Sequence, residues 1–232
     1  MKLATLAELN AERAARRPVI VVTDTDGGEQ RLVKAKDFAA DPLRTELTKQ
    51  LRTGKSGMVE VSGKKLFLNV YAPTARLVII GAVHISQALA PLARSLGYDV
   101  TVVDPRTAFA SPERFPDVPL VAEWPDVALP PLNVDHYTAF VAVTHDPKID
   151  DPALLHAFQR DCFYIGALGS RKTHAKRAER LKAQGATDAD IAKIHAPIGL
   201  AIGAVSPSEI AVSIMAEITA NLRMPKEKEA VA

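Results

Sequence analysis

Cysteine is nearly absent from this chain of 232 residues, which contains Cys162 alone. A single cysteine excludes a disulfide within the chain and a metal site built on a Cys-x-x-Cys pair. Cys162 opens the apolar stretch CFYIGALG, so a buried and unreactive thiol is favoured over a nucleophile.

Excess charge and long apolar runs are also lacking. The 29 basic and 27 acidic residues leave a formal net charge of +2, too small to predict nucleic-acid binding without basic residues gathered on one face. No stretch approaches the roughly 20 apolar residues that span a bilayer, and Glu8 and Glu12 interrupt the N-terminal segment where a signal peptide needs an apolar run. We expect no nucleic-acid partner, no membrane association and a cytoplasmic location.

What is present is a globular composition, with 47% hydrophobic and 24% charged residues. The length allows one α/β domain with a smaller partner. A short amphipathic helix is expected at 3–16, hairpins at 19–33 and 57–71, and a second amphipathic helix at 35–52. Residues 1–72 are therefore predicted to form a small α+β N-terminal domain. Its hairpins are too thin to close a core alone, which favours a homodimer.

From residue 76 onward, apolar strands alternate with helices, which predicts a parallel sheet with helices on both faces. The strands are expected at RLVII, DVTVVD, AFVAVT and CFYIGAL, and the helices at 84–96, 151–160, 171–184 and 206–222, with a weaker one at 188–194. We expect an α/β fold in which a Rossmann-like domain over 76–223 follows the linker APTAR. Residues 224–232 have little to bury and are expected to be disordered.

The turn in VIIGAVHIS only partly matches a dinucleotide fingerprint. Such a fingerprint needs a glycine for the tight turn, a second where the pyrophosphate approaches the backbone, and an acid about 20 residues later for the ribose. Gly81 and Asp104 meet the first and last requirements, whereas Val83 and Ser86 replace the other two glycines. Ordinary NAD(P) binding thus competes with a Rossmann-like turn that no longer binds tightly.

A second polar group ends the strand AFVAVT. Thr144, His145 and Asp146 leave the carboxyl end of this strand, where open α/β sheets place their ligands. Asp150 or Asp151 is expected to cap the next helix, with the following proline in its first turn. A histidine and an aspartate without a nucleophile do not make a hydrolase, so we favour ligand binding over a purely structural turn.

The stretch YIGALGSRKTHAKR carries the strongest local signal. Gly166 and Gly169 bracket a strand end, and Ser170 can cap the helix that begins at Arg171. Basic residues oppose the helix dipole at an N-terminus, which suggests that an anion sits there, although a solvated basic helix is the alternative. The other residues of this basic group are Lys172, His174, Lys176 and Arg177.

The last motif, HAPIGLAIGAVSPSEI, joins a loop to a helix. His195, Gly199 and Gly203 are expected in the loop, and Ser206 with Glu209 matches a capping box. The helix that follows has a mostly apolar sequence and is expected to belong to the core.

In this order, the motifs GAVHISQALAPLA, VTVVDPR, YIGALGSRKTHAKR and IHAPIGL, followed by SPSEIAVSI, resemble the XdhC/CoxI family, the xanthine dehydrogenase accessory factors. The resemblance covers about residues 66–222. It implies a chaperone that binds molybdenum cofactor, helps its sulfuration and delivers it to an apo molybdenum hydroxylase. Members of the family are typically dimeric.

Two departures qualify the resemblance. The family turn usually reads Gly-Ala-Gly-His, whereas Val83 replaces the second glycine here. The N-terminal part lacks the family's Ser-Pro-Arg and Gly-Gly-Cys motifs, so with only Cys162 available, sulfur would have to come from a partner cysteine desulfurase.

Our main hypothesis is therefore a molybdenum cofactor chaperone without catalytic residues or a metal site of its own. The cofactor, as molybdopterin or its cytosine dinucleotide form, is expected to bind transiently. The alternatives are an NAD(P)-dependent oxidoreductase and a ligand-free interaction module. Expected partners are an apo molybdenum hydroxylase of the xanthine dehydrogenase or CO dehydrogenase type, a desulfurase, a cofactor nucleotidyltransferase and a second copy of the chain. The expected contacts are Gly81, His84, Asp104, Thr144, His145, Asp146, Gly166, Gly169, Ser170 and Arg171.

Overall fold

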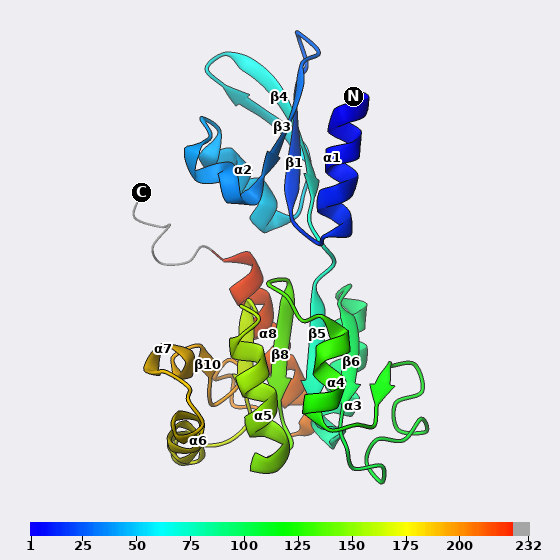
Figure 1. The fold of residues 1–232 in the computed structure, drawn as a ribbon, viewed down its shortest axis with the longest axis vertical. Coiled ribbons are helices and arrows are strands. Elements are labelled where there is room, and N and C mark those ends of the chain that lie inside the picture. The colour runs from blue at the N-terminus through cyan, green and yellow to red at the C-terminus, as the bar shows by residue number, and fades with distance from the viewer. Residues whose placement is uncertain (225–232) are drawn as a thin grey trace. The chain divides into compact units, whose positions relative to one another are not determined.

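The computed structural model describes residues 1–224. By its internal contacts the described chain divides into two compact units, Met1–Pro73 and Thr74–Leu222 (Figure 1). The expected disordered tail lies outside the described residues except for Met224. Over residues 1–224, no helix is both long enough and apolar enough to cross a membrane.

The N-terminal unit is a four-stranded antiparallel sheet in the order β2-β1-β4-β3. The two expected hairpins join through β1 and β4, which places β1 inside the sheet, and helices pack on both of its faces. Ile20 and Leu68 pack with Leu47 on one face, and Val19 and Val21 pack with Leu9 on the other. The elements are α1 (Leu3–Ala14), β1 (Val19–Asp24), β2 (Gln30–Lys34), the 3-10 helix η1 (Ala35–Ala40), α2 (Arg44–Thr53), β3 (Gly57–Val61) and β4 (Lys64–Tyr71).

The single helix expected at 35–52 is wrong, because the structure has η1 and then α2. Asp41 between them is extended, with ψ 138°. A residue before proline avoids the helical region, and Pro42 has no N–H to donate. The apolar spacing of the segment indicated one helix, whereas this local proline divides it into two.

The second unit contains a six-stranded parallel sheet in the order β10-β9-β8-β5-β6-β7 (Figure 1). This confirms the Rossmann-like sheet with helices on both faces. If β5 is counted as the first strand of this sheet and the sheet is followed from β7 to β10, the strand order is 3-2-1-4-5-6. The direction of the order changes between β5 and β8. The elements are β5 (Arg76–Ile80), α3 (His84–Ser95), β6 (Asp99–Val103), β7 (Leu120–Val121), α4 (Pro125–Leu132), β8 (Thr138–Ala142), α5 (Pro147–Phe158), β9 (Tyr164–Ala167), α6 (Arg171–Ala183), α7 (Asp188–Ile191), β10 (Ile194–His195) and α8 (Pro207–Arg223).

Alternate side chains of the central strands enter two cores. Leu77 and Ile79 of β5 pack with α3 and α8, while Val78 and Ile80 pack with helices on the opposite face. Burial on both faces explains the nearly continuous apolar strand sequences. Three elements were not predicted: β7 and β10, which have two residues each, and α4, whose sequence PDVALPPL is rich in proline.

Candidate functional site

The candidate site lies at the carboxyl ends of β6, β5, β8 and β9. These strands are neighbours in the sheet, and the strand order reverses between β5 and β8. Open α/β sheets bind ligands beside such a reversal. The expected site residues lie in the loops that follow these four strands, except His84 and Arg171, which begin α3 and α6, and Gly166, which lies inside β9.

The turn after β5 is held tightly against its neighbours. Gly81 has φ +117°, and a Cβ atom placed there would lie 2.8 Å from Cγ2 of Thr144. Ser86 donates from its hydroxyl to the Gly81 carbonyl at 2.5 Å. Val83 occupies the N-cap position of α3 and makes no side-chain capping hydrogen bond, and His84 beside it is exposed. The backbone conformation and the close contact with Thr144 thus require a glycine at position 81, whereas the place of the second fingerprint glycine is taken by the apolar residue Val83.

Asp104 is completely buried and its oxygens are occupied from within the chain. They accept hydrogen bonds from the Ala82 N–H at 2.7 Å and from the backbone N–H, Nε and Nη2 of Arg106 at 2.9, 2.9 and 2.8 Å. Burial alone would raise the pKa of this carboxyl, but the hydrogen bonds from Arg106 and Ala82 outweigh burial and lower the pKa. Asp104 therefore ties the β5 turn to β6, and the half-buried Arg106 lies over it.

The turn after β8 is organised by Asp150. Its carboxylate accepts from the Thr144 hydroxyl at 2.7 Å, from the Thr144 N–H at 3.3 Å and from the His145 N–H at 3.1 Å. Burial raises the pKa of Asp150, against the Thr144 hydrogen bond and the charge of Arg177. His145 is exposed and has φ +63°, in the left-handed region. Asp150 thus fixes the backbone that presents His145 to solvent.

The expected helix cap at Asp150 or Asp151 is wrong. Helix α5 begins at Pro147, and Asp146 is its N-cap, accepting from the Lys148 N–H at 2.9 Å. Asp151 instead accepts two hydrogen bonds from Arg180 at 2.7 and 3.0 Å.

The turn after β9 opens helix α6. Gly169 has φ +131°, and Ser170 caps the helix by accepting from the Thr173 N–H at 3.2 Å. The first turn of α6 contains no acidic residue, and Arg171 and Lys172 are exposed. Gly166 lies within β9, where a Cβ atom would come 2.5 Å from Cδ1 of Ile198, so its place in the structure is one of close packing.

Arg177 was expected in the basic group around the start of α6, but unlike Arg171 and Lys172 it is buried. Its side chain is 2% exposed, and its Nη2 donates to the Leu168 carbonyl at 2.8 Å, directly before Gly169. Its Nε and Nη1 have no hydrogen-bond partner. Burial lowers the pKa of the guanidinium, and the charges of Asp150 and Asp151 oppose this. A buried cation with unused donors therefore lies behind the turns after β8 and β9.

Three features of this edge were not predicted from the sequence. They are the pairing of Arg106 with Asp104, the hydrogen bonds by which Asp150 holds the turn after β8, and the burial of Arg177. Of the expected residues, Gly81, Asp104, Thr144 and Gly166 are buried, Asp146 and Gly169 are half-buried, and His84, His145, Ser170 and Arg171 are exposed. An arginine two residues after the strand-ending acid was the one signal available for Arg106.

The groups that the carboxyl edge of the sheet offers to a ligand are backbone N–H groups, hydroxyls and cationic side chains. Within residues 1–224 no group of three or more His, Cys, Asp or Glu residues could hold a metal ion. Cys162 precedes β9 and so lies at the opposite end of that strand, and burial raises the pKa of its thiol to about 12. The chain therefore offers anion-binding groups and no thiolate.

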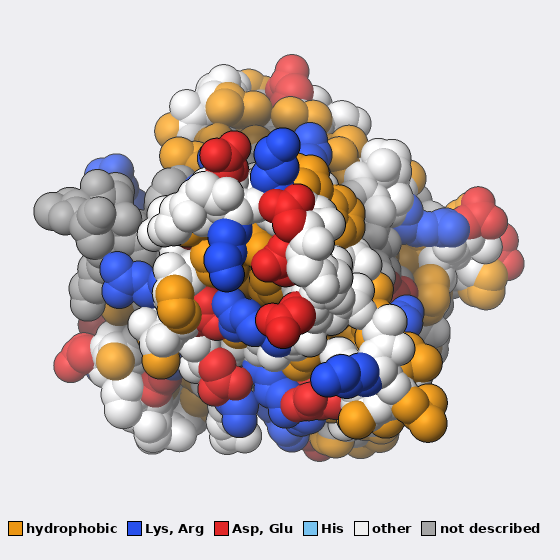
Figure 2. Space-filling model, turned by 90° about the horizontal axis from the view of Figure 1, so that it is seen from above, with side chains coloured by type: hydrophobic (Ala, Val, Ile, Leu, Met, Phe, Trp, Pro, Cys, Tyr) orange, Lys and Arg blue, Asp and Glu red, His pale blue; other side chains and the backbone are white. Residues whose placement is uncertain are grey.

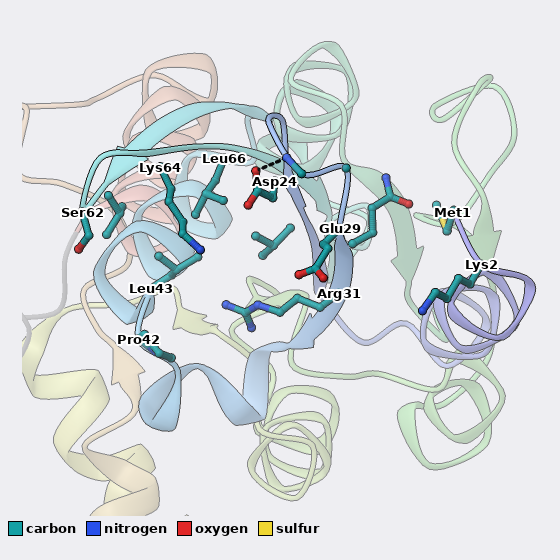
Figure 3. A pocket seen from close by; sticks show the side chains of 15 residues that line it. Met1, Lys2, Asp24, Glu29, Arg31, Pro42, Leu43, Ser62, Lys64 and Leu66 are labelled. Carbon is teal, nitrogen blue, oxygen red and sulfur yellow. Dashed lines mark hydrogen bonds between the residues drawn. The ribbon is translucent and has the colours of Figure 1, made fainter.

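A hollow of about 840 Å³ lies within the N-terminal unit. Figure 3 shows the side chains of Arg31 and Lys64 pointing into it above an apolar floor that includes Leu43. Arg31 is paired with Asp41, and Asp24 accepts from the Gly27 N–H at 3.0 Å. Blue and red side chains lie next to one another over this face (Figure 2). Because opposite charges compensate one another, the hollow favours neither an anion nor a cation.

The segment after β10 is fastened to α8 by Glu217. Its carboxylate accepts from the Tyr164 hydroxyl at 2.6 Å and the Gly199 N–H at 2.7 Å, and lies 3.0 Å from His195 Nδ1. Burial alone would raise the pKa of Glu217, but these hydrogen bonds lower it. His195 ends β10 rather than lying in the expected loop, whereas the capping box of Ser206 and Glu209 is confirmed.

Comparison with known proteins agrees with this architecture. The family model described as XdhC Rossmann domain matches residues 77–218. Three curated relatives match about two thirds of the chain. From Escherichia coli (strain K12), Uncharacterized protein YqeB is 34% identical over 155 residues (66% of this chain, 28% of that protein). A probable xanthine dehydrogenase subunit of Bacillus subtilis (strain 168) is 34% identical over 154 residues (66% and 44%). Molybdenum cofactor insertion chaperone PaoD of E. coli (strain K12) is 31% identical over 159 residues (68% and 43%).

The chain spans less than half the length of these relatives. A crystal structure described as a xanthine dehydrogenase from Bacillus halodurans shares the fold, with a TM-score of 0.69 and 23% identity, over 98% of this chain and 68% of that one. The match of the family model over most of the second unit decides the assignment: the chain belongs to the XdhC/CoxI family.

Proposed function

We propose that this chain binds molybdenum cofactor at the carboxyl edge of the Rossmann sheet and passes it to an apo molybdenum hydroxylase of the xanthine dehydrogenase or CO dehydrogenase type. The relative PaoD is named a molybdenum cofactor insertion chaperone, and the B. subtilis relative is named as part of a xanthine dehydrogenase. Both are longer than this chain, so the proposal concerns the part that they share with it.

The turn after β9 is the observation that carries the proposal. Helix α6 starts with Ser170 as its cap and has no acidic residue in its first turn. Arg177 lies behind this turn, buried and with two nitrogens unpartnered. Native proteins rarely leave buried donors unused, and such donors indicate a missing partner. A helix N-terminus with cations nearby suits an anion such as a phosphate.

The residues present fit the phosphate and ring of such a cofactor better than its metal. When bound, the cofactor supplies the molybdenum chemistry that the client enzyme uses. Arg171 and the N–H groups of the α6 turn would hold the phosphate, and His84 and His145 are exposed on neighbouring turns as hydrogen-bonding groups. Because Cys162 is a half-buried thiol whose pKa is raised by burial, the sulfur is proposed to come from a partner cysteine desulfurase.

Loose binding fits a carrier. Val83 stands where a dinucleotide-binding turn has the glycine that admits the pyrophosphate. We therefore propose transient retention of molybdopterin or its cytosine dinucleotide form, which a nucleotidyltransferase partner would produce. We further propose that the protein works in the cytoplasm.

Replacing Arg171 by alanine should weaken binding of molybdenum cofactor about ten- to a hundredfold, because a charge-assisted contact is worth about 1.5–3 kcal/mol. The thermal unfolding midpoint should stay unchanged or rise slightly, since a cation opposing the helix dipole is removed. Fluorescence titration and thermal unfolding of the same variant test both statements. Lys176→Ala, which removes an exposed cation from the second turn of α6, is the matched control and should change affinity less than threefold.

Unchanged cofactor affinity in the Arg171 variant would move the site away from α6. Titration with NAD(P)H distinguishes the remaining alternatives. NAD(P)H turnover without cofactor binding would favour an oxidoreductase, and binding of neither would favour an interaction module.

A homodimer also stays a proposal. The thinness of the hairpins does not support it, because Ile20, Leu47 and Leu68 are fully buried within the N-terminal unit itself. The family resemblance remains its basis. Light scattering at micromolar concentration should give twice the chain mass of 25.0 kDa, and a monomer mass would refute the dimer.

A further inference from the structure

One corner of the cleft contains charged residues that an anion bound at the start of α6 does not account for. It lies after β6, at the position where a dinucleotide-binding Rossmann domain receives the ribose hydroxyls on an acid. Here that acid, Asp104, is 0% exposed and accepts four hydrogen bonds, three of them from Arg106. A ribose diol would have to displace Arg106 to reach the carboxylate. The carboxylate of Asp104 is therefore closed to a ribose diol, the group that an acid at this position ordinarily binds.

Arg106 itself remains available to a ligand. Its Nε and Nη2 are committed to Asp104, while its side chain is 31% exposed. The hydrogen bond to Asp104 does most to raise the pKa of the guanidinium, and the charges of Asp146 and Asp150 add to it. Asp146 is the N-cap of α5 after β8 and Asp150 lies in the first turn of that helix, so Arg106 lies close to the turn after β8.

An exposed aromatic ring and a second cation complete the corner. The Cζ atom of Arg106 lies 4.5 Å from the centroid of Phe109, and that of Arg114 lies 5.7 Å from the same ring. Phe109 is 41% exposed. Arg114 is fixed by donating to the Phe109 carbonyl at 2.9 Å and to Oε1 of Gln87 at 3.0 Å. Two guanidinium groups thus lie within about 6 Å of the centre of one partly exposed ring, and one of them, Arg106, covers the buried Asp104 carboxylate.

We propose that Arg106, Phe109 and Arg114 form a subsite for a phosphomonoester carried next to a heteroaromatic ring, and that Arg106 determines this specificity. Guanidinium groups bind phosphate through paired N–H donors, and an exposed aromatic side chain offers a stacking face. The subsite deepens the proposed function, since it names a ligand class for another corner of the same cleft. The phosphate can belong to a nucleotide, or to a pterin cofactor whose phosphate then lies at this subsite rather than at α6.

Calorimetric titration of the full chain with two probes tests the subsite. Adenosine 2′,5′-bisphosphate carries a phosphate where adenosine 5′-monophosphate carries a ribose hydroxyl. We expect the bisphosphate to bind at least tenfold more tightly. Arg106→Ala should reduce this preference to less than threefold or reverse it, because the uncovered Asp104 repels phosphate and accepts a hydroxyl. Arg106→Lys, which keeps the charge without the planar fork, should give an intermediate preference.

Two further variants guard against misfolding of the Arg106 variants. Phe109→Ala leaves the pair of Asp104 and Arg106 intact and should weaken both probes by a similar factor. Arg94→Ala removes an arginine from the end of α3 and should leave the preference unchanged. Equal affinity of the native chain for the two probes, binding of neither, or a tenfold preference that survives Arg106→Ala would overturn the proposal.

The same measurements separate this subsite from the proposed cofactor function. Arg171→Ala should keep the preference for the bisphosphate while it loses cofactor affinity. A native chain that shows the preference but binds no molybdenum cofactor would refute the proposed function and leave the subsite standing. Displacement of the bisphosphate by the cofactor would assign the subsite to the pterin phosphate, and simultaneous binding would assign it to a nucleotide.

Discussion

Asp150→Ala should lower the free energy of unfolding by about 3–5 kcal/mol, the cost typical of leaving a buried charge without its partner. Asp150 is 2% exposed and accepts from the Thr144 hydroxyl and the His145 N–H. It is also the carboxylate that most strongly opposes the lowering of the Arg177 pKa by burial. Alanine removes the acceptor and the negative charge together. Urea denaturation followed by circular dichroism measures the loss.

A surface control and a double variant decide whether the buried charge is responsible. Asp117→Ala removes an exposed carboxylate and should cost less than about 0.5 kcal/mol. Combining Asp150→Ala with Arg177→Met should recover at least half of the loss, because no unpaired charge then remains inside. Additive losses in the double variant, or a loss below about 1 kcal/mol in the single variant, would contradict this account.

Gly199→Ala should cost about 2–5 kcal/mol through two separate effects. Gly199 has φ +89°, a conformation that costs an alanine about 1–2 kcal/mol. A Cβ atom there would also lie 2.2 Å from the Ser213 hydroxyl and 3.0 Å from the Ser213 carbonyl carbon, and overpacking of this kind costs about 1–3 kcal/mol. Thermal and urea unfolding of the variant give the sum.

Gly203→Ala in the same loop separates the two effects. Gly203 has φ +77°, and a Cβ atom there would meet nothing within 4 Å. The Gly203→Ala variant should therefore lose only the conformational part of the free energy of unfolding, about 1–2 kcal/mol. Equal losses at the two glycines would show that the contact with Ser213 contributes nothing.

The parallel sheet could be predicted because its strands are buried on both faces. After Arg76, the strand RLVII has Leu77 and Ile79 in one core and Val78 and Ile80 in the other, so its last four residues include no polar position that would suggest a solvent-facing side. By contrast, β7 and β10 are two residues long and carry no periodicity. Helix α4 contains three prolines, which ordinarily argue against a helix.

The start of α5 shows why local signals did not suffice. Asp146 before Pro147 and Asp151 before Pro152 both match a capping residue followed by proline. Tertiary contacts decide between them, since Asp151 is bound to Arg180 and lies inside the helix. Nothing within the segment itself indicates that pairing.

The turns of the candidate site could be predicted from the sequence, but the charged side chains buried behind them could not. Strand ends and glycines indicated the turns after β5, β8 and β9. No local pattern indicates, however, that Arg177 is buried, because arginine normally marks the solvent face of a helix, and here Arg177 and Leu181 form the buried face of α6. Arg106 was likewise hidden, since its effect comes from covering Asp104 in space.

We expect the three hydrogen bonds to Glu217 to slow hydrogen exchange in the segment after β10. Gly199 lies in a segment without regular structure, yet its amide hydrogen is held by the Glu217 carboxylate of α8 at 2.7 Å. To exchange with solvent, this amide has to leave a carboxylate that also holds Tyr164 of β9 and His195 of β10. Amides in such shared networks open together. We therefore expect the loop around Gly199 and the helix α8 to open as one cooperative unit, so that hydrogen-exchange protection of this irregular segment matches that of the helix it binds.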